Sequence, residues 1–210
     1  MAKTIIDAHN VSKTFNPKTI PVHAVQNVHV HIEEGEFVAL VGPSGSGKST
    51  LLNMMGGLDE PTEGTVFIDG VEITNLSENK LIDFRLHNIG FVFQSFNLIP
   101  VLTAKENVGF VLQLQHLPKE DREKRVLALL EEVGLEDKIN SKPGELSGGQ
   151  QQRVAVARAL ASKPKIILAD EPTANLDSKS AANLLDIMAK LNKEEKITFL
   201  FSTHDQRVIK

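Results

Sequence analysis

The sequence predicts an α/β fold built around a parallel β-sheet, because apolar strand patterns alternate with helical patterns along the chain. Residues 38–41 and 166–169 are apolar on both faces, as expected of strands buried inside a parallel sheet. Residues 197–201 form a further strand pattern. Helical patterns occupy residues 48–55 and 179–191. Strands that alternate with helices in this way favour a parallel sheet with right-handed crossovers.

The remaining elements follow from the same patterns. Residues 28–32 alternate between apolar and polar side chains, which is typical of a strand with one buried face. Further strands are expected at 65–69 and 89–93. From about residue 98 to residue 140 the pattern is helical. We find no internal repeat and no low-complexity tract.

Length and composition describe an ordinary globular chain. Its 210 residues predict one or at most two domains, and 41% of them are hydrophobic and 24% charged. A net charge of −4 argues against a general nucleic-acid binder, so we expect no nucleic-acid partner. The absence of cysteine excludes disulfides, thiolate zinc sites and a thiol nucleophile. No stretch approaches the ~20 apolar residues of a membrane span, and no signal peptide begins the chain, so we expect a soluble, cytoplasmic protein.

A glycine-rich loop between the first buried strand and the next helix fits the phosphate-binding pattern GxxxxGK[ST]. Its glycines let successive N–H groups point at one anion, and the start of the helix adds a partial positive charge. Lys48 is expected to reach the β- and γ-phosphates, Ser49 to hold Mg²⁺ and Thr50 to contact the α-phosphate. The residues predicted to bind the nucleotide here are Gly42, Pro43, Ser44, Gly45, Ser46, Gly47, Lys48, Ser49 and Thr50.

Polar residues at the ends of two later strands complete a candidate catalytic site. Asp170 follows a buried strand, at the edge where parallel sheets bind ligands, and is our candidate Mg²⁺ ligand. Glu171 comes next, and we interpret it as the general base or as the residue that positions water. The alternative for Glu171 is a helix-capping acid. His204 follows the third strand at the same edge. It is the one histidine whose position and surrounding sequence suit a role in this site.

The segment Leu146–Gln150 reads LSGGQ, and with it the chain resembles the nucleotide-binding domain of ATP-binding cassette (ABC) transporters. The resemblance covers nearly the whole sequence. It implies a P-loop ATPase with a parallel sheet core, an N-terminal antiparallel β subdomain and an inserted helical subdomain. Residues 1–93 and 162–210 would form the core and β subdomain, and about 94–161 the helical subdomain. The cofactors it implies are ATP and Mg²⁺.

The same resemblance assigns roles to four further positions. Gln94 is similar to the family's Q-loop glutamine, which senses Mg²⁺ and takes part in catalysis. Asp177 falls in a segment similar to the D-loop at the nucleotide, and His204 matches the switch histidine. Phe15 stands where the family places an aromatic residue that stacks on adenine. The alternative for Phe15 is a core residue of an edge strand.

The LSGGQ segment has a physical rationale of its own. Its serine and glycines open an apolar stretch that reads as a helix, so the helix start offers bare N–H groups, a hydroxyl and a positive dipole end to an anion. One compact domain cannot easily present two such anion sites to the same triphosphate. In the family the second site comes from another copy, which implies a head-to-tail dimer around two ATP. The residues implied are Ser147, Gly148, Gly149 and Gln150.

Residues 57–62 and 93–100 look most like the lipoprotein-release and macrolide-exporter group of the family. This implies an integral membrane permease subunit, contacted near residues 94–100, and a location on the inner face of the cell membrane through that subunit. The chain stops six residues after His204, where family domains normally continue, so we expect a truncated C-terminal end.

Three rival functions share part of this sequence pattern. A GTPase would share the phosphate loop, but its NKxD motif is only mimicked by the sequence NKEE at residues 192–195. A small-molecule kinase fits poorly, because the helix that begins at the LSGGQ segment would cover the γ-phosphate and block the molecule that accepts the phosphate. The stronger alternative is a non-transport cassette ATPase that regulates a membrane or cell-wall complex.

Overall fold

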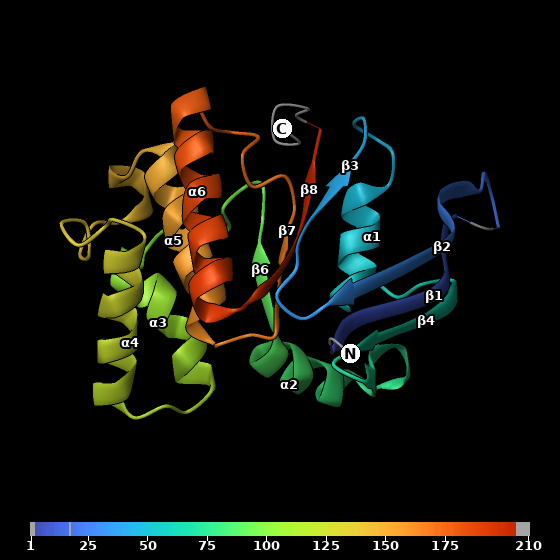
Figure 1. Ribbon diagram of the computed structural model, residues 1–210, viewed down its shortest axis with the longest axis horizontal. Coiled ribbons are helices and arrows are strands. Elements are labelled where there is room, and N and C mark those ends of the chain that lie inside the picture. Colours follow the sequence, from blue (N-terminus) through green and yellow to red (C-terminus); the bar gives the residue numbers. More distant parts are fainter. Residues whose placement is uncertain (1–2, 17, 205–210) are drawn as a thin grey trace.

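The computed structural model describes residues 3–16 and 18–204, and its core is a four-stranded parallel sheet of order β3-β8-β7-β6. Helices α5 and α6 lie on one side of this sheet and helix α1 lies on the other (Figure 1). The fold class predicted from the sequence is confirmed. The elements of the core are β3 (Phe37–Val41), α1 (Lys48–Met55), β6 (Ile89–Val92), α5 (Gly148–Ala161), β7 (Ile166–Ala169), α6 (Ser178–Glu195) and β8 (Thr198–Thr203).

The alternating side chains of the inner strands serve two separate cores. On β7, Ile167 and Ala169 pack with the helical side of the molecule, whereas Ile166 and Leu168 pack with the side that contains α1. All four are fully buried. Each of the isoleucine and leucine side chains contributes about 1.5–3 kcal/mol when it leaves water, so both faces of the sheet stabilise the fold.

Strand β3 departs from the expectation that it is buried on both faces. It lies at the edge of the described sheet and pairs with β8 alone. Ala39 and Val41 are exposed, and Val38 and Leu40 are partly buried. The apolar run therefore marked a strand of the sheet correctly but overestimated its burial, because an edge strand has a neighbour on one side only.

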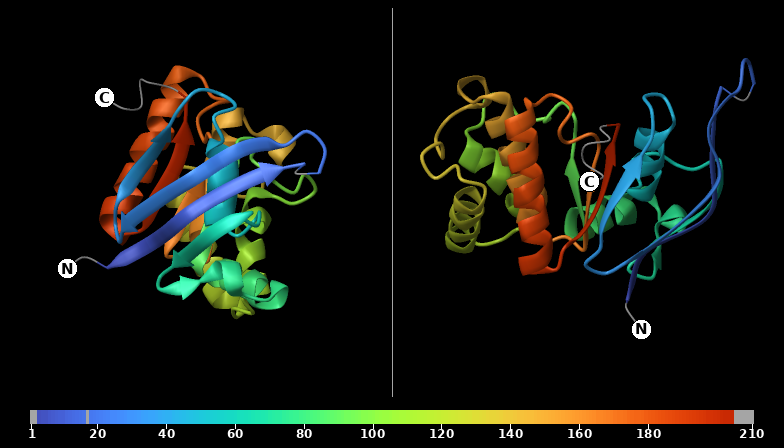
Figure 2. Two further views of the ribbon diagram at one scale, coloured as in Figure 1. Left: turned by 90° about the vertical axis from the view of Figure 1, so that its right-hand side faces the viewer. Right: turned by 45° about the horizontal axis from the view of Figure 1, so that its top comes forward.

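A second sheet is antiparallel and has the order β2-β1-β4-β5. It stands beside α1 as a separate layer (Figure 2). The expected alternation is seen on β2, where Ile32 is buried and His29 and His31 are exposed. The strands are β1 (Thr4–Phe15), β2 (Val22–Glu33), β4 (Glu63–Ile68) and β5 (Val71–Glu72).

Three further helices are α2 (Glu78–Asn88), α3 (Ala104–Leu114) and α4 (Lys119–Glu132). Helices α3 and α4 pack against α5, and all three helices contribute buried apolar residues, among them Val108, Leu129 and Val156, to one hydrophobic cluster. Asn107 anchors the segment before α3, because its buried side chain accepts from Ile99 N at 2.8 Å and donates to Leu102 O at 3.0 Å. The segment that follows β6 is thereby fixed to the helical layer.

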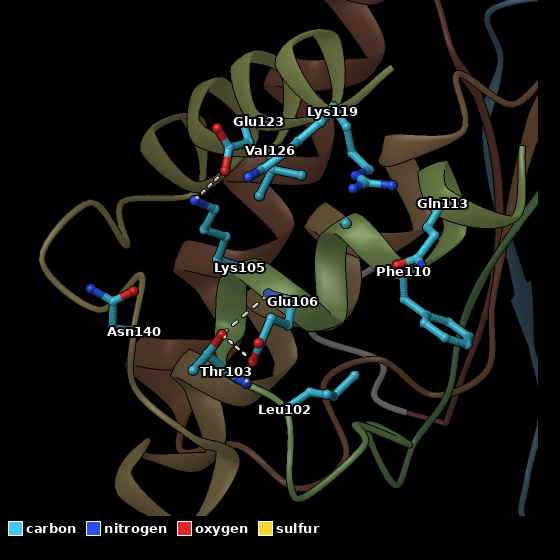
Figure 3. Close-up of a pocket in the computed structure, with 12 residues that line it drawn as sticks. Leu102, Thr103, Lys105, Glu106, Phe110, Gln113, Lys119, Glu123, Val126 and Asn140 are labelled. Carbon is cyan, nitrogen blue, oxygen red and sulfur yellow. Dashed lines mark hydrogen bonds and ion pairs between the residues drawn. The ribbon is translucent and has the colours of Figure 1, made fainter. Parts of the chain in front are cut away.

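Within residues 3–16 and 18–204, no helix combines the length and the apolar character needed to cross a bilayer. A cavity of about 590 Å³ lies between α3 and α4, and Lys105 of α3 pairs with Glu123 of α4 at 3.1 Å across it (Figure 3). None of the residues that line this cavity belongs to the candidate site predicted from the sequence.

Candidate nucleotide site

The carboxyl ends of the core strands bring the predicted residues to one edge of the sheet. Val41 lies opposite Thr203 on β8, and Ala169 of β7 lies between Val92 of β6 and Phe201 of β8. The loops that leave these strands therefore start side by side. This is the edge at which parallel α/β sheets bind their ligands.

The loop between β3 and α1 has the backbone expected of a phosphate cradle. Gly45 and Gly47 have φ angles of +79° and +89°, which favour glycine. A Cβ at Gly47 would lie 2.3 Å from Ala24 O on β2, so no other residue fits there. Helix α1 begins at Lys48 without a side-chain cap and without an acidic residue in its first turn. Its first N–H groups have no intrahelical acceptor and can bind an anion.

Lys48 lies folded over this loop. It is only 7% exposed, and its Nζ donates to Gly42 O and Pro43 O at 2.9 Å each. The same Nζ lies 3.5 Å from Glu171 Oε1. A buried ammonium is stable only when it is paired, and here its partners are two loop carbonyls and one carboxylate.

Ser49 and Asp170 meet as the sequence predicted for a Mg²⁺ site. Ser49 Oγ donates to Asp170 Oδ1 at 2.9 Å. Two neighbouring ligands of an octahedral Mg²⁺ with bonds of about 2.0–2.1 Å are themselves about 2.8–3.0 Å apart, so the spacing of this oxygen pair fits the ion. No group of three His, Asp or Glu side chains forms a metal site among the described residues. The pair suits Mg²⁺, which is usually held by one or two carboxylates together with phosphates and water.

Glu171 is held from both its backbone and its side chain. Its N–H donates to Ser202 Oγ at 2.9 Å, and its φ angle is +43°. Its Oε2 lies 3.0 Å from His204 Nδ1, and because an ionised carboxylate only accepts, Nδ1 carries the proton in this hydrogen bond. Glu171 caps no helix, since Asp177 caps α6, so the alternative of a helix-capping acid is wrong.

The start of α5 differs from the expectation in one respect. Ser147 is the N-cap, and its Oγ accepts from Gln150 N at 3.3 Å while Gln150 Oε1 accepts from Ser147 N at 2.9 Å. This is a capping box, in which the serine and the residue three positions later satisfy each other. The N–H of Gln150 is therefore not bare, whereas Gly148 and Gly149 supply N–H groups without an intrahelical acceptor.

Helices α1 and α5 lie on opposite sides of the core sheet, so the loop before α1 and the start of α5 are not brought together within one chain (Figures 1 and 2). The start of α5 lies instead beside the segment before α6 and the first turn of α6. A Cβ at Gly148 would lie 3.6 Å from Asn175 O, and one at Gly149 would lie 3.2 Å from Ser180 Cβ.

The other predicted residues lie at the margins of the site. Gln94 is exposed two residues after Val92, whose carbonyl accepts from Asp170 N at 2.9 Å. Asp177 accepts from Ser180 N and Ser180 Oγ, and these bonds hold the pKa of its carboxyl below the usual range.

Phe15 ends β1, where it pairs with Val22, and Val22 is two residues from Ala24 at the glycine-rich loop. The ring is 39% exposed and has Lys13 Nζ at 5.2 Å from its centre. Phe15 is therefore not a core residue, and that alternative is wrong.

Sequence reasoning missed three side chains that organise the site. Ser202 is fully buried and donates to Asp170 Oδ1 at 2.7 Å while it accepts from Glu171 N. Asn175 donates to Gln94 O at 2.9 Å, and Arg158 donates to two carbonyls of the loop after Gln94. The available signal for Ser202 was a small polar residue at the end of an apolar strand.

Comparison with known proteins agrees with this geometry. Residues 25–174 match the family model described as ABC transporter. The chain is 50% identical over 208 residues to the uncharacterized ABC transporter ATP-binding protein MJ0796 of Methanocaldococcus jannaschii, covering 97% of this chain and 88% of the relative. It is 46% identical over 209 residues to the lipoprotein-releasing system ATP-binding protein LolD 1 of Chlorobium chlorochromatii, covering 98% and 85%.

A solved structure leads to the same family. The dimeric post-hydrolysis structure of the MJ0796 cassette, bound to ADP and Pi, superposes with a TM-score of 0.90 at 49% identity and covers 97% of this chain and 90% of that one. The family match spans more than half of the chain, and the relatives cover nearly all of it. The chain therefore belongs to the ABC transporter family, as an ATP-binding and ATP-hydrolysing subunit.

Proposed function

We propose that this subunit binds Mg²⁺-ATP at the edge of its core sheet, hydrolyses it in a head-to-tail dimer of two copies, and drives an integral membrane subunit of the lipoprotein-release or macrolide-export type. The observation that carries the proposal is the pairing of Ser49 with Asp170 and of Lys48 with Glu171 beside one uncapped helix start. These pairs support the proposal, because they bring an ammonium, two oxygens suited to Mg²⁺ and a carboxylate together beside the glycine-rich loop.

In this proposal the glycine-rich loop binds the triphosphate. The N–H groups at the start of α1 donate to phosphate oxygens, and Lys48 exchanges its bonds to Gly42 O and Pro43 O for the β- and γ-phosphates. Thr50, in the first turn of the same helix, contacts the α-phosphate. Phe15 stacks on the adenine, a role supported by its partly exposed ring at the end of β1.

Ser49 and Asp170 hold Mg²⁺, and Gln94 contributes a further contact from the end of β6. The bound ion would neutralise the charge that develops on the phosphates during transfer. Ser202 keeps Asp170 in place, because the two are joined by a buried 2.7 Å hydrogen bond. The Ser202 hydroxyl also accepts a hydrogen bond from Glu171 N. Ser202 therefore holds both the metal ligand Asp170 and the base Glu171 in place.

In this proposal Glu171 accepts a proton from the attacking water, and His204 orients the carboxylate of Glu171. The hydrogen bond from His204 Nδ1 leaves the other oxygen of the carboxylate 3.5 Å from Lys48 Nζ. A carboxylate held at two points has little freedom to turn away from the γ-phosphate, which lowers the entropy cost of the reactive geometry.

A second copy completes each site in this proposal. The start of α5, with Ser147, Gly148, Gly149 and Gln150, is an anion-binding helix start on the other side of the sheet from the chain's own phosphate loop. It can reach a triphosphate only on another molecule. Asp177 lies near the same surface. Dimeric structures of the similar MJ0796 cassette support this arrangement, and each loss of a γ-phosphate would weaken the contact between copies.

The membrane subunit binds an apolar groove of about 530 Å³ beside the segment 94–100. Phe110 and Leu114 of α3 border it and are 42% and 49% exposed, and Asn97 contributes from the segment itself. Exposed apolar side chains gathered in one hollow are typical of a protein interface. This partner would hold the chain at the inner face of the membrane, and a lipoprotein-release system is supported by the similar protein LolD 1.

The alternative of a regulatory, non-transport cassette ATPase is less well supported, because the similar proteins bear transporter names. Membership of the ABC transporter family also argues against a GTPase or a small-molecule kinase. Affinity purification from detergent-solubilised membranes separates transporter from regulator. We expect one integral membrane protein to be recovered, and much less of it when Leu114→Glu replaces an exposed side chain of the groove.

Glu171→Gln tests the catalytic proposal directly. The amide keeps the size of the side chain but cannot accept a proton, so we expect the variant to bind ATP, to stop turnover and to accumulate as a dimer on a sizing column. Asp186→Asn, on the exposed surface of α6, is the matched control and should hydrolyse ATP normally. Undiminished hydrolysis by Glu171→Gln would remove Glu171 from the role of base.

A further inference from the structure

A guanidinium on α5 joins that helix to the loop that follows Gln94. Arg158 donates from Nη2 to Phe96 O at 2.9 Å and from Nη1 to Asn97 O at 2.5 Å. Partial burial lowers the pKa of Arg158 from its usual value, because solvent is removed from the charge. None of the ion pairs among the described residues includes Arg158, so its hydrogen-bonding capacity goes to this loop rather than to a carboxylate.

The loop conformation explains why one side chain reaches both carbonyls. Phe96 and Asn97 have φ angles of +59° and +49°. The left-handed region is unfavourable by about 1–2 kcal/mol for a residue such as phenylalanine, so the conformation must be held from outside. The bonds within the loop are local, from Phe96 N to Phe93 O and from Asn97 N to Ser95 O. Arg158 is the charged donor that ties this turn to the helical layer.

Helix α5 touches the same loop at its other end. A Cβ at Gly148 would lie 3.7 Å from Phe96 Cζ. Gly148 and Arg158 are separated by about 15 Å of helix, so the loop lies beside α5 at two points, near the start and near the end of the helix. The loop is also attached to the segment before α6, because Asn175 Nδ2 donates to Gln94 O at 2.9 Å.

Arg158 and Asn97 also line the apolar groove that we assign to the membrane subunit. The contact between them is therefore part of the groove wall. Any element bound in the groove would therefore contact the place where helix α5 and residues 94–97 are joined.

We propose that Arg158 is a positioning residue that makes helix α5 and residues 94–97 move as one unit. Displacement of the groove wall then moves Gln94, at the metal of its own chain, together with Ser147, at the nucleotide of the other copy. This coupling rests on the roles assigned to Gln94 and Ser147 in the proposed function. Lysine cannot replace Arg158, because its one nitrogen cannot supply the two separate donors, Nη2 and Nη1, with which the planar guanidinium reaches Phe96 O and Asn97 O.

Arg158→Lys and Arg153→Lys form a matched pair of variants. Arg153 lies on the same helix and also donates to two carbonyls, Val133 O at 3.0 Å and Gly134 O at 3.2 Å, but these lie in a different loop. In the purified full chain, we expect amide hydrogen exchange in residues 94–98 to become at least about tenfold faster in Arg158→Lys, because hydrogen bonds from a charged donor are lost. Arg153→Lys should leave this segment unchanged.

A kinetic measurement separates positioning from general loss of structure. In Arg158→Lys we expect kcat to fall about tenfold or more and the Mg²⁺ concentration for half-maximal hydrolysis to rise, while the Kd for ATP without Mg²⁺ stays constant. Arg153→Lys should change neither. If Gln94→Ala alters the Mg²⁺ dependence and Arg158→Lys does not, the positioning role is overturned. If neither alters it but exchange responds, the metal role of Gln94 is wrong and the coupling stands.

A third measurement needs no substitution at Arg158 and covers the case in which Arg158→Lys does not fold. In Glu171→Gln, hydrogen exchange is followed in residues 94–98 and 148–153 during one titration with ATP. If the two segments are coupled, both become protected from exchange at the same ATP concentration, so that their titration midpoints agree. Different midpoints, or protection of one segment alone, would overturn the proposal, as would unchanged exchange of residues 94–98 in a folded Arg158→Lys protein.

Discussion

Glu171 Oε2 and His204 Nδ1 lie 3.0 Å apart, although the two residues leave different strands of the core sheet. The imidazole lies next to the candidate base and donates to it. His204 is itself half exposed, whereas the Glu171 carboxylate is largely buried. In the proposed mechanism, His204 orients the carboxylate of Glu171.

The first prediction concerns this hydrogen bond. His204→Ala should reduce kcat about tenfold or more while the Kd for ATP changes little, because orientation of the base is lost and the phosphate loop is untouched. His87→Ala, on α2, is the matched control. Steady-state kinetics together with equilibrium ATP binding check the result, and a large loss of ATP affinity with normal kcat would contradict it.

The second prediction concerns Ser202, which supports both Asp170 and Glu171. Removing the hydroxyl in Ser202→Ala leaves the Glu171 N–H without its acceptor, so we expect a loss of about 1–3 kcal/mol in unfolding free energy and a marked fall in kcat. Thr198→Ala tests specificity, because Thr198 is buried in the same strand and its Oγ1 accepts from Gly35 N. It should lower stability without lowering kcat in the folded protein.

The third prediction concerns Lys48. Lys48→Ala should weaken ATP binding roughly 10- to 150-fold, which corresponds to the 1.5–3 kcal/mol typical of hydrogen bonds to charged groups. Lys105→Ala removes a lysine paired with Glu123 between α3 and α4 and should leave ATP binding unchanged. Equal affinities of Lys48→Ala and the unsubstituted chain would show that the cradle is misassigned.

The fourth prediction concerns pH and the cap of α6. Hydrogen bonds from Ser180 lower the pKa of Asp177, so the ionised carboxylate is favoured in the folded state. Its contribution to stability is therefore fully present above the unfolded pKa of about 3.9 and is lost as pH falls through the lower folded value.

Denaturant unfolding of the unsubstituted chain and of Asp177→Asn checks this, since Asn keeps an acceptor but cannot ionise. We expect the difference in unfolding free energy to be constant near neutral pH and to shrink below about pH 4. Asp186→Asn, on the same helix, serves as the control. A difference that is independent of pH down to the acid transition would contradict the assignment.

Most of the fold could be predicted from the sequence because the patterns are local. The apolar run 166–169 gave a strand with two buried faces, and the helix at 48–55 begins and ends at the expected residues. The burial of β3 could not be predicted in the same way. Whether an apolar strand is central or at an edge depends on which strands pair, and pairing is a property of the whole sheet.

The residues of the candidate site also fall into those that local patterns predict and those that they do not. Lys48, Ser49, Asp170 and Glu171 lie together as the sequence indicates, because each belongs to a motif or follows a strand that ends at the same edge of the sheet. The contacts made by Ser202, Asn175 and Arg158 join segments 31 to 81 residues apart, so no local pattern marks them. The capping box at Ser147 was readable from its spacing, and it occupies one of the N–H groups inferred to bind the anion, that of Gln150.

In the proposed mechanism, each nucleotide is held by two copies of the chain. Mixing Lys48→Ala chains with Ser147→Arg chains tests it directly, because each heterodimer then contains one site with both defects and one intact site. Each variant alone should be nearly inactive, and an equal mixture should recover about a quarter of the unsubstituted ATPase activity, since half of the symmetric dimers are mixed. If heterodimers are demonstrated by two affinity tags and hydrolysis still does not recover, a site shared between copies is contradicted.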